Sequence, residues 1–513
     1  MEVSHPSIAV LDFGSQYSHL IVRRIREHGV HAELLAPDTR AEDLQDYKGI
    51  ILSGGPQNLS ASDALRVDTE VFELGVPVLG VCYGLQLMAY ELGGKVEASD
   101  KREYGRADVE VVSGSELFDG LDSTQQTWMS HGDHVTKAPD GFSVTSKSKT
   151  CAVAAMEDAS RKLYGIQFHP EVVHTTNGNK ILENFVSLTG APKTWSLGEA
   201  WIDAAVKQIQ EQAPEGRAVC ALSGGVDSTV AAYLVHRAIG NRLTCIYVDT
   251  GLMRLGETEQ IKKTFSALPD LDFRVVEAED MFLERLDGVT DPEKKRKIIG
   301  ELFINLFEAE AKKLGDVKWL VQGTLYTDAI TSGVSIGGKA ETIKSHHNVG
   351  GLPERLPFSL IEPLRDLYKD EVRTIGAALS IPEEIVTRQP FPGPGLAVRI
   401  IGAVTKEKLD MLRKADAILR EELEASEEHK DIQQYLAALP DIRSVGVQGD
   451  ARTYGHPIII RAVTTADFMT ADWARISYDV LATISTRITN EVDGVNRVVY
   501  DITSKPPGTV EWE

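Results

Sequence analysis

The sequence predicts an α/β protein in which two doubly wound parallel-sheet domains are followed by a smaller α+β domain. From residue 6 to about residue 190, short apolar segments that end in glycine alternate with amphipathic segments, and the same alternation starts again near residue 200. This alternation is typical of parallel sheets covered by helices. Three prolines and two glycines within residues 390–395 then interrupt the pattern, and the segments beyond them mix strands and helices.

The first block contains the clearest strand and helix patterns. SIAVLDFG is an apolar strand, and the segment after it repeats apolar residues at helical spacing through residue 28. GIILSGG and VPVLGVCYG read as further buried strands, whereas ADVEVV, SVTSKS and KLYGIQFHPEV favour additional, partly antiparallel strands. TGAPKTWS at residues 189–196 reads as a linker.

The second and third blocks also contain segments with strand and helix patterns. A helix is expected in LGEAWIDAAVKQIQEQ, followed by strands in RAVCALSGG, RLTCIYVDTG and KWLVQG. Residues 331–358 have weak periodicity and read as a mobile loop, a candidate lid. A charged helix at residues 405–426 opens the third block, where strands are expected in SVGVQG, HPIIIRAV and NRVVYDIT and a helix at residues 472–492.

Length and composition set limits on function. A chain of 513 residues is too long for one core, and we place domain boundaries so that the domains cover 1–192, 193–388 and 389–513. The net charge of −22 argues against a nucleic-acid or anionic-membrane surface. No apolar run approaches the roughly 18 residues of a membrane span, and the first residues do not resemble a signal peptide, so we expect a cytoplasmic protein. The four cysteines form no CxxC pair, which disfavours a zinc site or a disulfide framework.

Cys82 and the pair His169 and Glu171 form the first candidate site. Cys82 directly follows an apolar strand and lies between Gly80 and Gly84, as a nucleophile on a tight strand-to-helix turn does. A helix that begins at the next residue would lower the pKa of the thiol through its dipole. The alternatives are a buried core cysteine and, for the His-Pro-Glu segment, a surface ion pair.

The segment SGGVDST forms the second candidate site. It joins an apolar strand to an amphipathic helix, where backbone amides can bind phosphate oxygens. Its candidate ATP-binding residues are Ser223, Gly224, Gly225, Val226, Asp227, Ser228 and Thr229. Asp227 would repel phosphate unless a cation intervened, which suggests Mg²⁺, although an N-cap role is the structural alternative. The Walker pattern GxxxxGK is absent, which disfavours kinase-type phosphoryl transfer.

Together these motifs resemble two known families. GVCYGLQ and HPE, with the early VLDFG and SGGP segments, resemble class I glutamine amidotransferases over residues 5–190. The resemblance implies that Cys82 attacks the glutamine amide and His169 acts as the acid and base. It also implies that Glu171 orients the imidazole and that the N–H groups of Gly55 and Tyr83 form the oxyanion hole. SGGVDS resembles the pyrophosphate loop of the N-type ATP pyrophosphatases, which adenylate their substrates.

The combination of both domains in one chain resembles the GMP synthetase family over essentially the whole length. HHNVGGLPE is similar to its lid, and FPGPGLAVR, GVQGDARTYGHP and DITSKPPGTVEWE are similar to its carboxy-terminal dimerisation and XMP-binding domain. The resemblance implies glutamine, ATP with Mg²⁺, and XMP as substrates, a homodimer, and no tightly bound organic cofactor. Candidate XMP contacts are Arg254, Arg399, Lys505 and Glu511, whose charges would otherwise serve ion pairs at a dimer interface.

Three other readings compete with this one. A different product of the same activation chemistry, as in NAD synthetases, is disfavoured because those enzymes use another amidohydrolase domain. A non-catalytic nucleotide sensor is disfavoured by the intact Cys82, His169 and SGGVDS. A tRNA-modifying enzyme is disfavoured by the acidic charge. Without the resemblance, KPPGTVEWE would read as a frayed polar tail.

Overall fold

The computed structural model describes residues 6–513 except residues 60, 62–63, 113, 332–357, 449, 466–467 and 469. Within these ranges the chain forms two compact units, the first built mainly from residues up to 204 and the second from residue 205 onward. Apart from its two end residues, the expected lid at residues 331–358 lies outside the described residues, and so does the whole of the motif at 346–354.

The first unit is built on a nine-stranded sheet in the order β2-β1-β3-β4-β9-β8-β7-β5-β6. Its strands are β1 (Ile8–Leu11), β2 (Ala32–Leu35), β3 (Gly49–Leu52), β4 (Val78–Val81), β5 (Lys95–Val111), β6 (Thr124–Lys137), β7 (Ser143–Lys147), β8 (Ala155–Asp158) and β9 (Leu163–Ile166). The five strands from β2 to β9 are parallel, and the remaining pairs are antiparallel. The predicted doubly wound sheet with antiparallel additions is therefore confirmed.

The α-helices that accompany this sheet in the described part of residues 6–190 are α1 (Ser18–Glu27), α2 (Tyr83–Glu91) and α3 (Gly178–Thr189). The strands β1, β3, β4 and β9 are buried along their whole length, as a parallel sheet covered on both faces requires. Because the carboxyl ends of parallel strands lie at one edge, the segments that follow β3, β4 and β9 meet there.

The predicted linker is partly attached to the first unit. Residues between α3 and the next helix have no regular structure, but the backbone N–H of Trp195 donates to the carbonyl of Gly29 at 2.9 Å. The indole of Trp195 lies 4.3 Å from the guanidinium of Arg26 and 4.6 Å from the ring of His31. The linker therefore packs back onto the first unit at this residue.

The second unit contains a parallel sheet in the order β12-β11-β10-β13-β14. Its strands are β10 (Arg217–Leu222), β11 (Leu243–Asp249), β12 (Asp272–Glu277), β13 (Val317–Val321) and β14 (Ser359–Ile361). The described helices along residues 199–386, of which α4 begins and α9 ends in the first unit, are α4 (Glu199–Gln212), α5 (Val226–Ile239), α6 (Glu257–Ser266), α7 (Glu279–Leu286), α8 (Pro292–Lys312), α9 (Tyr326–Thr331), α11 (Lys369–Ala378) and α12 (Glu383–Val386). The strand order reverses between β10 and β13, which makes their carboxyl ends the expected ligand-binding edge.

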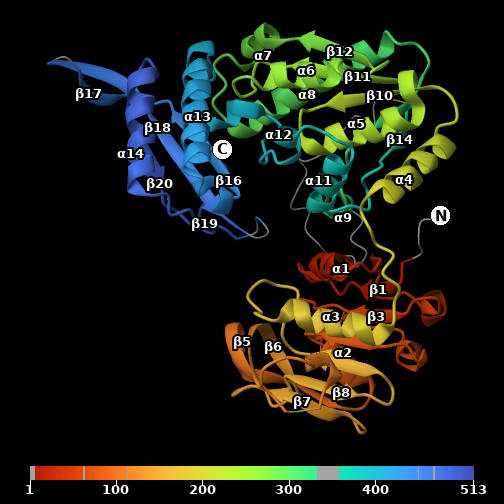
Figure 1. The fold of residues 1–513 in the computed structure, drawn as a ribbon. Helices are drawn as coiled ribbons and strands as arrows, with labels where there is room; N and C mark the ends of the chain where they lie inside the picture. The colour runs from red at the N-terminus through yellow and green to blue at the C-terminus, as the bar shows by residue number, and fades with distance from the viewer. Residues whose placement is uncertain are drawn as a thin grey trace. The chain divides into compact units, whose positions relative to one another are not determined.

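A second sheet in this unit completes the α+β part. It contains β15 (Ile400–Ile401), β16 (Gln434–Pro440), β17 (Ser444–Gln448), β18 (Ala451–Thr464), β19 (Asp472–Trp473) and β20 (Val495–Asp501), with four of these strands paired on β18. The helices α13 (Lys406–Ser426) and α14 (Tyr478–Glu491) lie side by side against it (Figure 1). The predicted helix at 472–492 begins only at Tyr478, because Ser477 caps it and residues 472–473 pair as β19.

The two sheets of the second unit share one hydrophobic core. The cluster includes Val219 of β10, Phe307 of α8, Leu409 of α13 and Ile458 of β18, all of them buried. The predicted domain boundaries at residues 192 and 388 stay predictions. Among the described residues, no helix is long and apolar enough to cross a membrane.

Candidate active sites

Cys82 lies on a strained turn between β4 and α2. Its backbone has φ 53° and ψ −103°, a left-handed value that few side chains adopt. The turn is possible because its neighbours are glycines: a Cβ at Gly80 would lie 2.6 Å from the backbone of Gly84, and one at Gly84 would lie 2.2 Å from the carbonyl oxygen of Leu52. Cys82 is the N-cap residue of α2 and so stands at the amino terminus of that helix.

His169 and Glu171 follow β9 and approach Cys82 from the neighbouring strand. The Nδ1 of His169 lies 2.7 Å from Oε1 of Glu171, and Cys82 is close enough to the imidazole to contribute to its pKa. Both side chains are buried, so the alternative of a surface ion pair is wrong. Burial opposes a charge on His169, but the Glu171 carboxylate and Cys82 outweigh it and raise the pKa of the imidazole well above 6.5. The arrangement thus favours an imidazolium next to Cys82.

The expected oxyanion-hole residues lie on the two turns that border Cys82. Tyr83 is the first residue of α2. Gly55 follows β3 and is closely packed, because a Cβ there would lie 2.6 Å from the carbonyl oxygen of Phe13. Gly54, which was not among the predicted site residues, lies next to His169. A Cβ at Gly54 would lie 3.0 Å from Cε1 of His169, so the absence of a side chain at Gly54 leaves room for the imidazole.

Two glutamines near Cys82 lie within the quoted motifs but were not predicted as site residues. The amide of Gln167 donates to the Cys82 sulfur at 3.6 Å, and the amide of Gln86 donates to the carbonyl of Asp133 at 2.7 Å. Cys82 itself donates to the carbonyl of Ser130 at 3.7 Å. Both glutamines are nearly inaccessible to solvent. Each is a polar residue within an otherwise apolar segment, and this sequence feature could have marked it as a buried, hydrogen-bonded side chain.

The SGGVDST segment joins β10 to α5 at the edge where the strand order reverses. Gly224 has φ +76°, and a Cβ there would lie 2.4 Å from the side chain of Ile261, so the turn requires glycine. The hydroxyls of Ser223 and Ser228 lie 3.1 Å apart in this turn. Thr229 was expected to offer a hydroxyl to phosphate, but it is fully buried and donates to the carbonyl of Gly225 at 2.9 Å.

Asp227 lies in the first turn of α5, directly after Val226. The helix is capped by Gly225, so the N-cap alternative for Asp227 is wrong. Its Oδ2 accepts a hydrogen bond from the ammonium of Lys369 at 2.5 Å. A cation therefore already accompanies this carboxylate, and nothing in the sequence marked a lysine 142 residues away as its partner.

The side chain of Arg388 contacts the same turn. Its Nη1 donates to the carbonyl of Gly224 at 2.5 Å, and its Nη2 forms an ion pair with Glu257. Glu257 in turn accepts the backbone N–H of Arg254 at 3.2 Å. The SGGVDST segment is thereby linked to the start of α6.

Three of the four predicted XMP-contact residues belong to one buried ion cluster. Arg399 donates to Glu511 through Nε at 3.0 Å and through Nη2 at 2.8 Å, and Arg254 lies 3.0 Å from Asp416. Arg254 and Arg399 are almost completely buried, so their charges are used inside the chain. Lys505 lies apart from this cluster and donates to the carbonyl of Phe468 at 2.5 Å.

The carboxy-terminal segment is held, and the alternative of a frayed tail is wrong. Glu513 accepts from the buried ammonium of Lys295 at 2.5 Å, and Trp512 donates to Asp501 at 3.0 Å. Glu511 and Trp512 also line a mostly apolar pocket of about 540 Å³. Its other lining residues are Pro440, Ile442, Pro457, Ile459, Val499, Tyr500, Asp501, Ile502, Thr503, Gly508 and Thr509.

Three family models match successive parts of the chain. The model of the glutamine amidotransferase class-I family matches residues 9–188, that of the thiamine biosynthesis protein (ThiI) matches residues 213–325, and that of the GMP synthase C terminal domain matches residues 421–512. The solved structure of a Thermoplasma acidophilum protein, assigned as part of a GMP synthase, is 31% identical and covers 36% of this chain and 95% of its own, with a TM-score of 0.33.

Full-length relatives are more similar still. The GMP synthase [glutamine-hydrolyzing] of Geobacillus kaustophilus is 58% identical over 99% of both chains, and that of Bacillus subtilis is 56% identical over 99% of this chain and 98% of its own. The fold and the matched families define an ATP-using ligase that carries a class I glutamine amidotransferase domain. The chain belongs to the GMP synthase [glutamine-hydrolyzing] family.

Proposed function

We propose that the first unit hydrolyses glutamine at Cys82, His169 and Glu171. The Cys82 thiolate attacks the side-chain amide carbon, and the N–H groups of Gly55 and Tyr83 stabilise the resulting oxyanion. The His169 imidazolium gives its proton to the leaving ammonia, which leaves a γ-glutamyl thioester. The neutral imidazole then takes a proton from water, which attacks the thioester and releases glutamate. The observation that carries the proposal is the buried 2.7 Å contact between His169 and Glu171 beside the nucleophile.

The second unit uses the ammonia in an ATP-dependent amination. In the proposed reaction, XMP, ATP, glutamine and water give GMP, AMP, pyrophosphate and glutamate. Adenylation of O2 of the xanthine makes AMP the leaving group, and ammonia displaces it at C2. The turn from Ser223 to Ser228 lies at the expected ligand-binding edge of its sheet and leads into the amino terminus of α5, where backbone N–H groups can bind phosphate oxygens, which supports this assignment.

Magnesium fits the donor groups of this turn. One carboxylate combined with substrate phosphates and water is the usual environment of Mg²⁺, and Asp227 provides that carboxylate. When bound, the ion would neutralise phosphate charge. Lys369, paired with Asp227 at 2.5 Å, would hold the carboxylate in place and add a second positive charge near the phosphates.

XMP is proposed to bind at the carboxy-terminal segment. The pocket beside Glu511 has the size of a small-molecule site, with Asp501 and Glu511 as acceptors at its wall. Because Arg254 and Arg399 form internal ion pairs, they are not proposed to contact the phosphate, and Arg399 would position Glu511. Lys505 is then the candidate phosphate contact.

The carboxy-terminal sheet also supports a homodimer. Val445, Val447 and Tyr454 on β17 and β18 expose 51%, 74% and 62% of their surfaces, more than apolar side chains of a closed surface usually do. Light scattering on the purified chain would test this: a monomeric mass at micromolar concentration would contradict it.

The amination assay tests the function as a whole. With ATP, Mg²⁺ and XMP, we expect GMP from either glutamine or ammonium. Cys82→Ala should abolish the glutamine-driven reaction and leave the ammonium-driven one close to wild type. Failure of the wild type with both donors would favour a nucleotide sensor, and loss of both activities in Cys82→Ala would contradict the separation of the two sites.

A further inference from the structure

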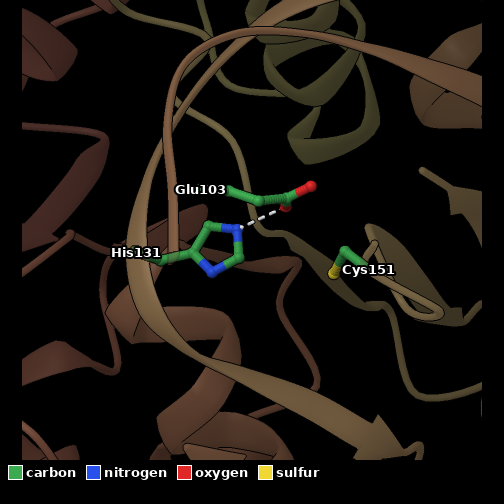
Figure 2. A group of neighbouring side chains, drawn as sticks. All are labelled: Glu103, His131 and Cys151. Atoms are coloured by element: carbon green, nitrogen blue, oxygen red, sulfur yellow. Dashed lines mark hydrogen bonds and ion pairs between the residues drawn. The ribbon is translucent and has the colours of Figure 1, made fainter. Parts of the chain in front are cut away.

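A second group of glutamate, histidine and cysteine lies in the first unit, apart from Cys82, His169 and Glu171. Glu103 of β5 and His131 of β6 face each other directly in the antiparallel register. Cys151 lies in the turn between β7 and β8. One oxygen, one nitrogen and one sulfur from these side chains lie within 4.8 Å of one another. Figure 2 shows the sulfur of Cys151 turned toward the pair formed by His131 and Glu103.

The hydrogen bonds of His131 leave its second nitrogen facing a carboxylate. Nδ1 lies 3.0 Å from the carbonyl oxygen of Asp133, and a carbonyl can only accept, so Nδ1 carries the hydrogen. Nε2 lies 3.0 Å from Oε2 of Glu103. In a neutral imidazole both of these atoms hold lone pairs. A proton or a cation must therefore lie between them.

The surroundings orient all three side chains. Cys151 is fully buried and His131 is 5% exposed. The hydroxyl of Ser148 donates to Oε1 of Glu103 at 3.2 Å and accepts the backbone N–H of Cys151 at 3.0 Å. Metal-binding histidines characteristically donate their other nitrogen to a backbone carbonyl, and metal-binding carboxylates are themselves hydrogen bonded. Both features are present here.

We propose that Cys151, His131 and Glu103 bind a zinc ion through Sγ, Nε2 and a carboxylate oxygen, with water as the fourth ligand. Tetrahedral zinc with bonds of about 2.0–2.3 Å places its ligands roughly 3.3–3.6 Å apart. Nε2 of His131 and Oε2 of Glu103 are already 3.0 Å apart, so the Cys151 sulfur is the atom that has to approach, by up to about 1 Å. Binding releases the thiol proton of Cys151 and any proton shared between His131 and Glu103. Among the residues that the structure describes, this is the one group of three or more His, Cys, Asp or Glu side chains whose ligand atoms all lie within 4.8 Å of one another.

The ion would fasten three segments beside the glutaminase site. It would link β5, β6 and the turn after β7, and His131 directly follows Ser130, whose carbonyl lies 3.7 Å from the Cys82 sulfur. No CxxC spacing marks this site, because its ligands come from three separate segments. Without metal, the same residues would form only a buried hydrogen-bonded pair next to a core cysteine.

Cobalt replaces zinc as a visible probe of this site. The full-length, tag-free chain is stripped with EDTA and titrated with Co²⁺. We expect one equivalent to bind with thiolate-to-cobalt charge transfer and the strong visible bands of tetrahedral Co²⁺. Cys151→Ser should lose the charge-transfer band, whereas Cys82→Ser, which removes the other thiol of this region, should keep it. Loss of the band in Cys82→Ser, or its persistence in Cys151→Ser, would overturn the proposal.

Glu103→Gln and thermal unfolding give an independent measurement. Glutamine keeps the size and a hydrogen bond to His131, so the folded chain should survive, while Zn²⁺ affinity should fall by about tenfold or more. Zn²⁺ should raise the Tm of the wild type and of Cys82→Ser, because it binds the folded state, and should leave that of Glu103→Gln and Cys151→Ser nearly unchanged. An equal rise in all four proteins would contradict the site.

Discussion

The guanidinium of Arg388 donates to the backbone carbonyl of Gly224 at 2.5 Å, although the two residues are 164 positions apart. Because a peptide group is planar and trans, fixing the Gly224 carbonyl also fixes the direction of the next N–H group. The turn proposed to bind pyrophosphate is thus oriented by a side chain from beyond α12. Glu257 holds the other end of that guanidinium, so the positive charge is compensated before any nucleotide binds.

Arg388→Ala should weaken ATP use selectively. The loss of one charge-assisted hydrogen bond is worth about 1.5–3 kcal/mol, which corresponds to a fall of about ten- to hundredfold in kcat/KM for ATP. Glutamine hydrolysis in the first unit should change little. Steady-state kinetics with varied ATP measures the first effect, and glutamate release measures the second.

Two controls separate positioning from damage to the fold. Arg388→Lys keeps the charge opposite Glu257 and should retain more activity than Arg388→Ala. Lys318→Ala removes a surface lysine that pairs with Glu215 elsewhere in the same unit and should leave kcat/KM for ATP unchanged. An Arg388→Ala protein with normal KM for ATP and normal Tm would show that the contact does not position the turn.

Gly54→Ala should impair the first site through His169. The added Cβ would lie 3.0 Å from Cε1 of the imidazole, which must then move away. Because a displacement of about 1 Å can cost on the order of a hundredfold in rate, glutamine-driven GMP formation should fall by about that factor. Ammonium-driven formation should persist. Gly198→Ala is the matched control, since a Cβ there meets nothing within 4 Å.

Glu171→Gln should change the pH dependence of stability and of Cys82 reactivity. Folding raises the pKa of His169 above its ordinary value of 6.5, against the effect of burial, through Glu171 and Cys82. The corresponding stability is fully present below pH 6.5 and is lost as the pH rises through the raised pKa. The Tm difference between wild type and Glu171→Gln should therefore be larger at slightly acidic pH than at alkaline pH.

Alkylation of Cys82 by iodoacetamide reads the same equilibrium directly. At neutral pH the rate should fall in Glu171→Gln by up to about tenfold for each unit by which the pKa of His169 falls, because fewer molecules hold the thiolate and imidazolium pair. Identical rates and identical Tm differences across the pH range would mean that Glu171 does not set the protonation of His169.

Arg399 and Lys505 should respond differently to the same substitution. Arg399→Met leaves Glu511 without its buried arginine partner, although Asp416 keeps Arg254, and breaking such a pair costs about 3–5 kcal/mol, so the Tm should drop clearly. Lys505→Met should leave the Tm almost unchanged and raise KM for XMP. Thermal scans and kinetics with varied XMP distinguish the two, and a stable Arg399→Met protein with raised KM would reverse the assignment.

The sequence predicted what is local along the chain. The buried strands, the glycines on either side of Cys82 and the SGGVDS turn each carry their signal within a few residues, and the sheet architecture follows from their alternation. The beginning of α14 was missed because Ser477 resembles many other serines until its cap is seen. The partners of the functional residues were missed for a different reason.

Lys369, Arg388 and Gly54 act through contacts that sequence spacing does not encode. Lys369 reaches Asp227 from 142 positions away, and such a contact depends on the closed fold. The assignment of Arg399 to substrate followed from its charge, whereas its complete burial, which redirects that charge to Glu511, appears only in three dimensions. Long-range ion pairs are thus the part of a site that local patterns leave out.

The single core shared by the two sheets of the second unit decides where such a chain can be divided. Val219 and Ile458 belong to one cluster, so a cut near residue 388 would open apolar surface on both fragments. All the strands of the nine-stranded sheet belong to the first unit itself. Gene fission that separates an ammonia-producing polypeptide from a synthetase polypeptide is therefore compatible with this architecture, while fission between the nucleotide site and the carboxy-terminal sheet is not.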